Sequence, residues 1–313
     1  MANAVTSLRT ATNYVHIIGT LEEKNLTKEV VDGKNIIRGD LVLSTGEDKK
    51  FKVSYYVNEF TSTGTESKAY KALLTVDNEY VSKATALAEG RDLSEVSVVE
   101  VRGSFATNDF VSKKTGEIIS ETVVRSMFAS RVMDDKEPVA EFEIETYFES
   151  IEDEKDENGN LTGRVVIKGI TPIYNGQVMP ITLYTSTDTS YVNVGDYIKA
   201  NYKTGKSGKV RGYLNCTAKT TTYVKEGFGA PASERTFTSY SFEPIVNDGD
   251  KEQYLITDAK NFDKASIKAA MLYRTETLEA KKAKASSTPA PTAGFNSVPT
   301  SAPASAEDEE MDW

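Results

Sequence analysis

Residues 67–90 read SKAYKALLTVDNEYVSKATALAEG, and they interrupt an alternation of apolar and polar residues that runs on both sides of them. Within this stretch the apolar residues from Tyr70 to Leu87 recur at steps of three, four and seven, which is the period of a helix. Gly90 is a typical helix end. The stretch therefore predicts one helix, or two short ones, inserted into a chain of strands.

Three strands are expected before this helix and two after it. Alternation covers residues 13–23, 35–44 and 49–57, and it returns over residues 96–132 as two long strands joined by a turn at 113–117. Three strands, a helix and two strands are the order of the OB-fold, a five-stranded Greek-key barrel. An open sandwich with the same number of strands is the alternative.

A weak internal repeat indicates a second barrel. Residues 141–187 can be laid over residues 14–57 at an offset of roughly 125 to 130, about the length of one domain. After Tyr184 the sequence continues as strands with a basic loop and without a long helix, which predicts a reduced barrel. Glycines within three long strands of the first barrel suit its sharp bends: Gly19, Gly39 and Gly103.

The chain accordingly divides into four parts. Residues 1–138 are expected to form the first OB-fold domain and residues 139–250 a second, reduced OB-like domain. Residues 251–285 form a C-terminal helical segment with Asp263 as N-cap, and residues 286–313 form a disordered linker and acidic tail. The predicted fold class is mainly β: tandem OB-fold-like five-stranded barrels with a C-terminal helix and a disordered acidic tail.

The negative charge is unevenly distributed. The chain has a formal net charge of -10, but its last 28 residues hold five acids and no Lys or Arg. An acidic cluster at residues 152–158 adds to this, so the remaining sequence is close to neutral. Basic faces are therefore possible in the two barrels despite the overall charge.

The sequence contains no recognisable catalytic constellation. Its one histidine, His16, lies in a strand pattern, and its one cysteine, Cys216, has no histidine signal nearby. Phosphate-loop, dinucleotide-binding and nucleophile-elbow motifs are absent. The cluster at 152–158 is interpreted as a solvated hairpin loop rather than a calcium loop. We therefore expect no enzymatic activity, no cofactor and no metal.

The expected compartment is the cytoplasm. A single cysteine cannot form an internal disulfide, which suits a reducing environment. The start of the sequence lacks the zones of a signal peptide, and no run of 18 apolar residues occurs. We expect no membrane association, and host cytoplasm if the protein is encoded by a phage.

Aromatic and cationic residues on the outward sides of strands predict a surface for single-stranded nucleic acid, because rings stack on bases and cations bind the backbone. A structural role remains the alternative for each residue, since strand parity changes at bulges. The candidates in the first barrel are Arg38, Lys52, Tyr56, Arg102, Phe110, Lys113 and Lys114. Those in the second are Arg164, Lys168, Tyr184, Tyr202, Lys203, Lys206, Lys209, Arg211 and Tyr213.

Tandem barrels, a low-complexity linker and acids ending on an aromatic residue resemble single-stranded DNA-binding proteins of the bacterial and phage type. The resemblance implies that the tail docks on replication and recombination proteins, with its acids on a basic rim and its ring in a pocket. The usual bacterial ending is a run of aspartates followed by Ile-Pro-Phe. Here the tail residues are Glu307, Asp308, Glu309, Glu310, Met311, Asp312 and Trp313.

The expected function is sequence-independent binding and protection of single-stranded DNA during replication, recombination and repair, with partners recruited by the tail. The affinity for DNA is expected to fall steeply as the salt concentration rises. Self-association of the protein is compatible with this function. One alternative is a phage structural, assembly or adaptor protein with β-rich domains. A second is an RNA-binding or DNA-annealing OB protein, which would share the same surface.

Overall fold

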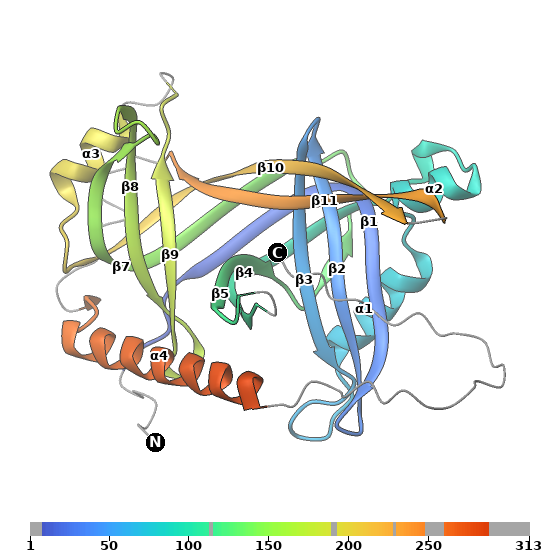
Figure 1. Ribbon diagram of the computed structural model, residues 1–313, viewed down its shortest axis with the longest axis horizontal. Coiled ribbons are helices and arrows are strands. Elements are labelled where there is room, and N and C mark those ends of the chain that lie inside the picture. Colours follow the sequence, from blue (N-terminus) through green and yellow to red (C-terminus); the bar gives the residue numbers. More distant parts are fainter. Residues whose placement is uncertain (1–7, 113–114, 189–192, 228–229, 248–259, 288–313) are drawn as a thin grey trace.

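The computed structural model describes residues 8–112, 115–188, 193–227, 230–247 and 260–287. It is mainly β, and all of its named strands belong to one continuous sheet that closes into two barrels side by side (Figure 1). The order of strands within each barrel is that of the OB-fold, so the predicted fold class is confirmed.

The first barrel closes in the order β1-β2-β3-β5-β4-β1. Its strands are β1 (Asn13–Val31), β2 (Lys34–Gly46), β3 (Lys49–Asn58), β4 (Val98–Val111) and β5 (Ile118–Arg125). All neighbours are antiparallel except β3 and β5, which pair in parallel through Val53 with Val124 and Ser54 with Arg125. A short strand, β6 (Ala129–Arg131), adds to the outer edge of β4. The closed ring excludes the open sandwich.

Two helices lie between β3 and β4, as the second form of the prediction allowed. They are α1 (Lys68–Glu79) and α2 (Lys83–Glu89), followed by a single 3-10 turn, η1 (Leu93–Glu95). Ser67 caps α1 by accepting a hydrogen bond from Tyr70 N, and Ser82 caps α2 in the same way. The second cap site follows a residue in extended conformation, Tyr80, so the chain turns between two helices instead of continuing one.

The second barrel repeats the same closed order, β7-β8-β9-β11-β10-β7. Its strands are β7 (Val139–Lys155), β8 (Leu161–Pro172), β9 (Val178–Thr185), β10 (Ser207–Gly227) and β11 (Ala230–Val246), with a 3-10 turn η2 (Tyr174–Gly176) before β9. The barrel has five strands, with a short helix between β9 and β10. Residues expected to continue as strands form α3 (Val194–Asn201) instead, where Asn193 caps the helix and Val194 and Ile198 are buried.

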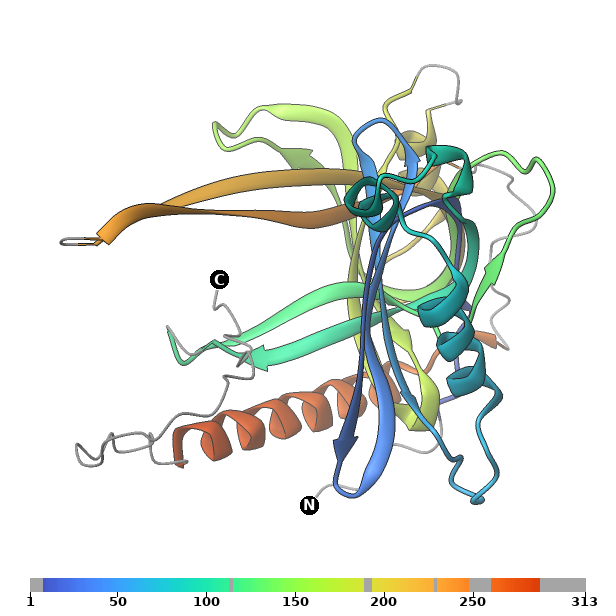
Figure 2. The same ribbon diagram turned by 90° about the vertical axis from the view of Figure 1, so that its right-hand side faces the viewer.

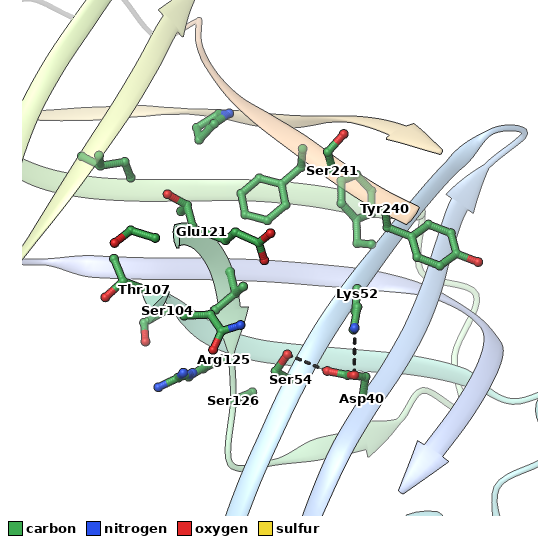
Figure 3. A pocket seen from close by; sticks show the side chains of 18 of the residues that line it. Asp40, Lys52, Ser54, Ser104, Thr107, Glu121, Arg125, Ser126, Tyr240 and Ser241 are labelled. Carbon is green, nitrogen blue, oxygen red and sulfur yellow. Dashed lines mark hydrogen bonds and ion pairs between the residues drawn. The ribbon is translucent and has the colours of Figure 1, made fainter. Parts of the chain in front are cut away.

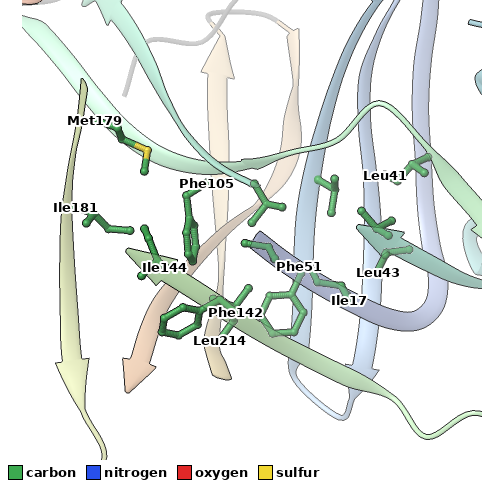
Figure 4. Close-up of a cluster of buried hydrophobic side chains, with 14 of the residues drawn as sticks. Ile17, Leu41, Leu43, Phe51, Phe105, Phe142, Ile144, Met179, Ile181 and Leu214 are labelled. Carbon is green, nitrogen blue, oxygen red and sulfur yellow. The ribbon is translucent and has the colours of Figure 1, made fainter. Parts of the chain in front are cut away.

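The two barrels are joined through their central strands. Residues 13–18 of β1 pair antiparallel with residues 139–144 of β7. The sheet therefore continues from one barrel into the other through this pair of strands. One buried apolar cluster runs through both barrels. Phe105 of β4 and Phe142 of β7 meet edge to face across the junction, with ring centroids 5.5 Å apart (Figure 4). This continuous core holds the outer faces of the barrels in one arrangement.

The C-terminal helix α4 (Lys264–Ser287) packs on the second barrel at its N-terminal end. Asp263 accepts a hydrogen bond from Ser266 N at 2.8 Å, as expected of an N-cap. Ile267 and Ala270 are buried in a second apolar cluster that also contains Ile170 of β8 and Val178 of β9. None of the described helices is long and apolar enough to cross a membrane.

Candidate nucleic-acid interface

A groove of about 1900 Å³ runs over the outer faces of both barrels. Strands β2 and β3 line it on the first barrel, and strands β8 and β9 line it on the second. Three elements project from the same side of the molecule around it: the β4-β5 hairpin, the β10-β11 hairpin and α4 (Figure 2). In an OB-fold, strands two and three and the hairpin between strands four and five form the ligand-binding face. Here both such faces open into one groove.

On the first barrel, Arg38, Lys52 and Tyr56 all line the groove, as the alternation of β2 and β3 predicts. Tyr56 is 58% exposed and lies directly opposite Arg38 in the sheet. Lys52 is 3.1 Å from the carboxylate of Asp40, which also accepts a hydrogen bond from Ser54 at 2.6 Å (Figure 3). The tyrosine ring is therefore available for stacking beside cations that already have carboxylate partners.

On the second barrel, Lys168 of β8 and Tyr184 of β9 line the groove, but in a different register: Lys168 lies opposite Thr182, and Tyr184 lies opposite Val166. Lys168 is exposed, and Tyr184 is half-buried with the guanidinium of Arg164 4.4 Å from its ring centroid. Burial and then the nearby Glu243 carboxylate raise the pKa of the Tyr184 hydroxyl. Arg164 does not line the groove, and its guanidinium is paired with Glu154 and Glu243.

Several groove residues were missed by the sequence reasoning. Arg125 ends β5 and reaches the groove because β5 pairs in parallel with β3, a contact between segments far apart in the chain. Tyr240 and Phe242 come from β11, whose long hairpin with β10 extends over the first barrel. In the sequence, the only sign of a binding role at these positions is that one residue is basic and two are aromatic. Their place in the groove depends on tertiary structure.

The β10-β11 hairpin is fastened to the first barrel by side-chain contacts. Tyr240 donates a hydrogen bond to Glu23 of β1 at 2.8 Å, and burial together with this bond raises the pKa of its hydroxyl. Phe242 stacks on Phe105 with ring centroids 6.0 Å apart. The half-buried Cys216 donates to the carbonyl of Lys50. A hairpin of the second barrel thus forms one side of the groove over the first.

The groove is nearly balanced in charge, in a chain of net charge -10. Six cationic side chains line it: Arg38, Lys50, Lys52, Arg125, Lys168 and Arg274. Five acidic side chains line it as well: Glu23, Asp40, Glu121, Glu149 and Glu243. Serine and threonine hydroxyls contribute much of the remaining surface. The described residues hold no cluster of three or more metal-ligating side chains.

The second predicted cluster lies elsewhere. Lys209, Arg211 and Tyr213 of β10 do not line the groove, and neither does Arg102 of β4, a candidate of the first barrel. Lys209 and Arg211 both bind Glu143 of β7, whose pKa is raised by burial but lowered overall by these two partners. These cations link β10 to the neighbouring strand β7, on a surface outside the groove lining.

Arg102 belongs to a second ion-pair network on this separate surface. Its guanidinium is 2.8 Å from Glu100, which Lys136 and His16 also contact. Hydrogen bonds from Lys136 and then Arg102 lower the pKa of Glu100 to about 2. Because His16 of β1 lies opposite Arg102 and contacts the Glu100 carboxylate, the network strengthens the pairing of β1 with β4.

The remaining candidates have different positions. Tyr202 is a correction: it is buried, its ring packs edge to face on Phe148 at 5.2 Å, and its hydroxyl donates to Lys209 O at 3.1 Å. Phe110 is half-buried in β4, and Lys203 and Lys206 are exposed before β10. None of the four lines the groove. Outside the described residues are Lys113, Lys114, Glu307, Asp308, Glu309, Glu310, Met311, Asp312 and Trp313.

Comparison with known proteins finds no match among curated sequences. Among solved structures, wild-type single-stranded DNA-binding protein from Thermus aquaticus superposes with a TM-score of 0.41 at 14% identity, covering 66% of this chain and 87% of that chain. A deletion mutant of the same Thermus protein gives a TM-score of 0.39 at 14% identity, covering 79% of this chain and 100% of that chain. The model of the YorF family matches residues 11–284, which includes both barrels and most of α4. The chain therefore belongs to the YorF family.

Proposed function

We propose that the groove binds single-stranded DNA without sequence preference and protects it. One observation carries the proposal: strands two and three of each barrel contribute a cation and a tyrosine to the same groove, Arg38 and Tyr56 from the first barrel and Lys168 and Tyr184 from the second. Strands two and three of an OB-fold form its oligonucleotide-binding face, and a ring with a nearby cation suits a stacked base and its phosphate. Each barrel contributes one such pair.

The size and lining of the groove favour a polymer. Small-molecule sites usually enclose about 300 to 1,000 Å³, whereas this groove of about 1900 Å³ extends over two barrels and three projecting elements. Exposed rings bind every base through its face, and hydroxyls accept or donate hydrogen bonds without selecting a sequence. We propose binding rather than catalysis, a role supported by the absence of catalytic motifs from the sequence.

The ion pairs of the groove predict a moderate dependence of affinity on salt, in place of the steep one expected from the sequence. Four groove cations already have a carboxylate partner: Arg38 with Glu29, Lys50 with Glu22, Lys52 with Asp40 and Arg274 with Asp109. Arg125 and Lys168 have no ion pair with any described residue. Each phosphate contact on a single strand contributes a slope of about -0.7 to log K against log salt, so two contacts give about -1.4.

Fluorescence anisotropy of a labelled oligo-dT at several salt concentrations tests the proposal. We expect salt-sensitive binding that excess duplex does not displace, with a slope between about -1 and -2. Absence of binding would contradict the proposal and leave a β-rich structural or adaptor role. A slope steeper than about -4 would mean that the paired cations exchange their carboxylates for phosphates. Competition with oligo-U distinguishes a DNA-binding protein from the alternative of an RNA-binding protein, which would bind oligo-U in preference to oligo-dT.

We propose in addition that the tail recruits replication, recombination and repair proteins, in the cytoplasm where such DNA occurs. Its support is the sequence, five acids ending on Trp313, and the family resemblance of that arrangement. Ending the chain at Ala306 is expected to leave oligo-dT affinity unchanged or higher, because repulsion between acids and phosphates is removed. Affinity capture should lose replication and recombination proteins with the shortened bait. Equal capture by both baits would contradict the docking role.

A further inference from the structure

The second half of α4 extends beyond the second barrel to the β4-β5 hairpin of the first. The first half is fixed to the second barrel by the buried Ile267 and Ala270. Farther along the helix, Lys282 Nζ is 2.8 Å from a carboxylate oxygen of Glu117, in the turn between β4 and β5. Figure 2 shows α4 running alongside this hairpin, on the same side of the molecule. The helix therefore spans the two barrels.

The main contact between helix and hairpin is the ion pair of Arg274 with Asp109. Arg274 Nη2 is 2.6 Å from Asp109 Oδ1, and its Nη1 donates to Thr107 Oγ1 at 3.3 Å. The side chains are only 15% and 10% exposed. Burial raises the pKa of Asp109, but hydrogen bonds from Arg274 and Ser120 outweigh burial and lower it overall. Arg274 therefore binds the β4-β5 hairpin through an ion pair that is largely shielded from solvent.

One stripe of α4 lines the groove next to this ion pair. Met271, Arg274, Thr275 and Leu278 all line it, and their spacing of three, one and three residues places them on a single helix face. Met271 and Leu278 are half-buried. Leu272 lies on another face of the same helix, is 60% exposed and does not line the groove. The helix therefore presents a specific apolar surface to the groove.

We propose that α4 is part of the nucleic-acid site: Leu278 and Met271 contact bases, and Arg274 is a positioning residue that holds the β4-β5 hairpin against the helix. The consequence is that one strand of DNA engages both barrels at once. This inference rests on the proposed function of the groove. Because Arg274 is paired and shielded, it acts through the hairpin and the helix, whereas the apolar stripe is available to the flat faces of bases.

A matched pair of leucine variants tests the apolar surface. Leu278→Ser is expected to weaken oligo-dT binding about fivefold, since a base loses an apolar contact, while Leu272→Ser is expected to leave affinity unchanged. Both substitutions remove the same side chain from the same helix, and helical content by circular dichroism controls for folding. Equal affinities for the two variants would overturn the role of α4 in binding.

Oligonucleotides of two lengths test the positioning role. Arg274→Met is expected to weaken binding of an oligo-dT of about 30 nucleotides roughly tenfold, and to leave one of about 8 nucleotides nearly unchanged, since only the longer one needs both barrels. Lys268→Met is the control, because Lys268 is exposed on α4 outside the groove. The exchange of Asp109→Arg with Arg274→Asp should restore part of the lost affinity.

The outcomes separate this inference from the proposed function. If the unaltered protein binds neither oligonucleotide, the proposed function fails. If it binds both but Arg274→Met and Lys268→Met behave alike at each length, the positioning role is wrong. An equal loss at both lengths would also contradict it, because general damage to the fold weakens every complex. Asp109→Asn provides a second test of the same contact if Arg274→Met does not fold.

Discussion

Replacing Tyr56 and Tyr184 together by alanine is expected to abolish most of the affinity for single-stranded DNA. A stacked base contributes about 1 to 3 kcal/mol by alanine substitution, so the loss of two rings raises the dissociation constant by roughly 30-fold or more. Tyr56 should account for the larger part, because it is 58% exposed while Tyr184 is half-buried beside Arg164. Anisotropy of labelled oligo-dT measures both single variants and the pair.

Two other tyrosines provide the controls for this experiment. Tyr174→Ala removes a ring that is 76% exposed but lies outside the groove. Tyr213→Ala removes a ring on β10 that the sequence analysis named as a DNA-binding candidate but that does not line the groove. Both are expected to bind as the unaltered protein does. A larger loss with Tyr213→Ala than with Tyr56→Ala would move the site from the groove to the surface formed by β7 and β10.

Gly212→Ala is expected to cause the largest loss of stability among single-methyl additions to the second barrel. A Cβ at Gly212 would lie 1.8 Å from Ile245 O on the paired strand β11, a distance that only a backbone shift can relieve. A cost of at least about 4 kcal/mol is expected, and it lowers the melting temperature by roughly 10 °C or prevents folding. Thermal unfolding followed by circular dichroism measures the effect.

Gly46→Ala is the matched control. Gly46 also lies in a strand, β2, but nothing is within 4 Å of an added Cβ and its φ is not positive. Its melting temperature is expected to stay close to that of the unaltered protein. If Gly212→Ala and Gly46→Ala unfold at the same temperature, the close approach of β10 to β11 is not important for stability. Gly39→Ala should resemble Gly212→Ala, because its Cβ would lie 1.9 Å from Asn25 O at φ +134°.

The error over Tyr202 shows where reading strand parity fails. The residues after Tyr184 were expected to continue as strands with a basic loop, and the neighbouring Lys203 and Lys206 suggested that Tyr202 is exposed. In the structure α3 ends just before Tyr202, and the ring continues the buried side of that helix against Phe148. The period of a short helix and that of a strand are hard to separate over eight residues. Packing on β7, rather than local pattern, decided the outcome.

For five candidates in the groove, the strand parity read from the sequence was correct. Arg38, Lys52, Tyr56, Lys168 and Tyr184 line it because alternate residues of a strand share a face, and that periodicity is local. The other groove-lining elements come from contacts between distant segments. They include the parallel pairing of β3 with β5, the β10-β11 hairpin over the first barrel, and α4 beside the β4-β5 hairpin.

The amino-acid sequence by itself determined the strands, the helical insertion between β3 and β4, the repeat and the outward residues of β2, β3, β8 and β9. These features depend on local periodicity and on the burial of apolar side chains. Tertiary structure alone decided that both barrel faces open into one groove, that Arg125 and Tyr240 line it, and that Arg211 and Tyr213 do not. Pairing between distant strands sets those positions, and its register depends on the three-dimensional fit of the whole core.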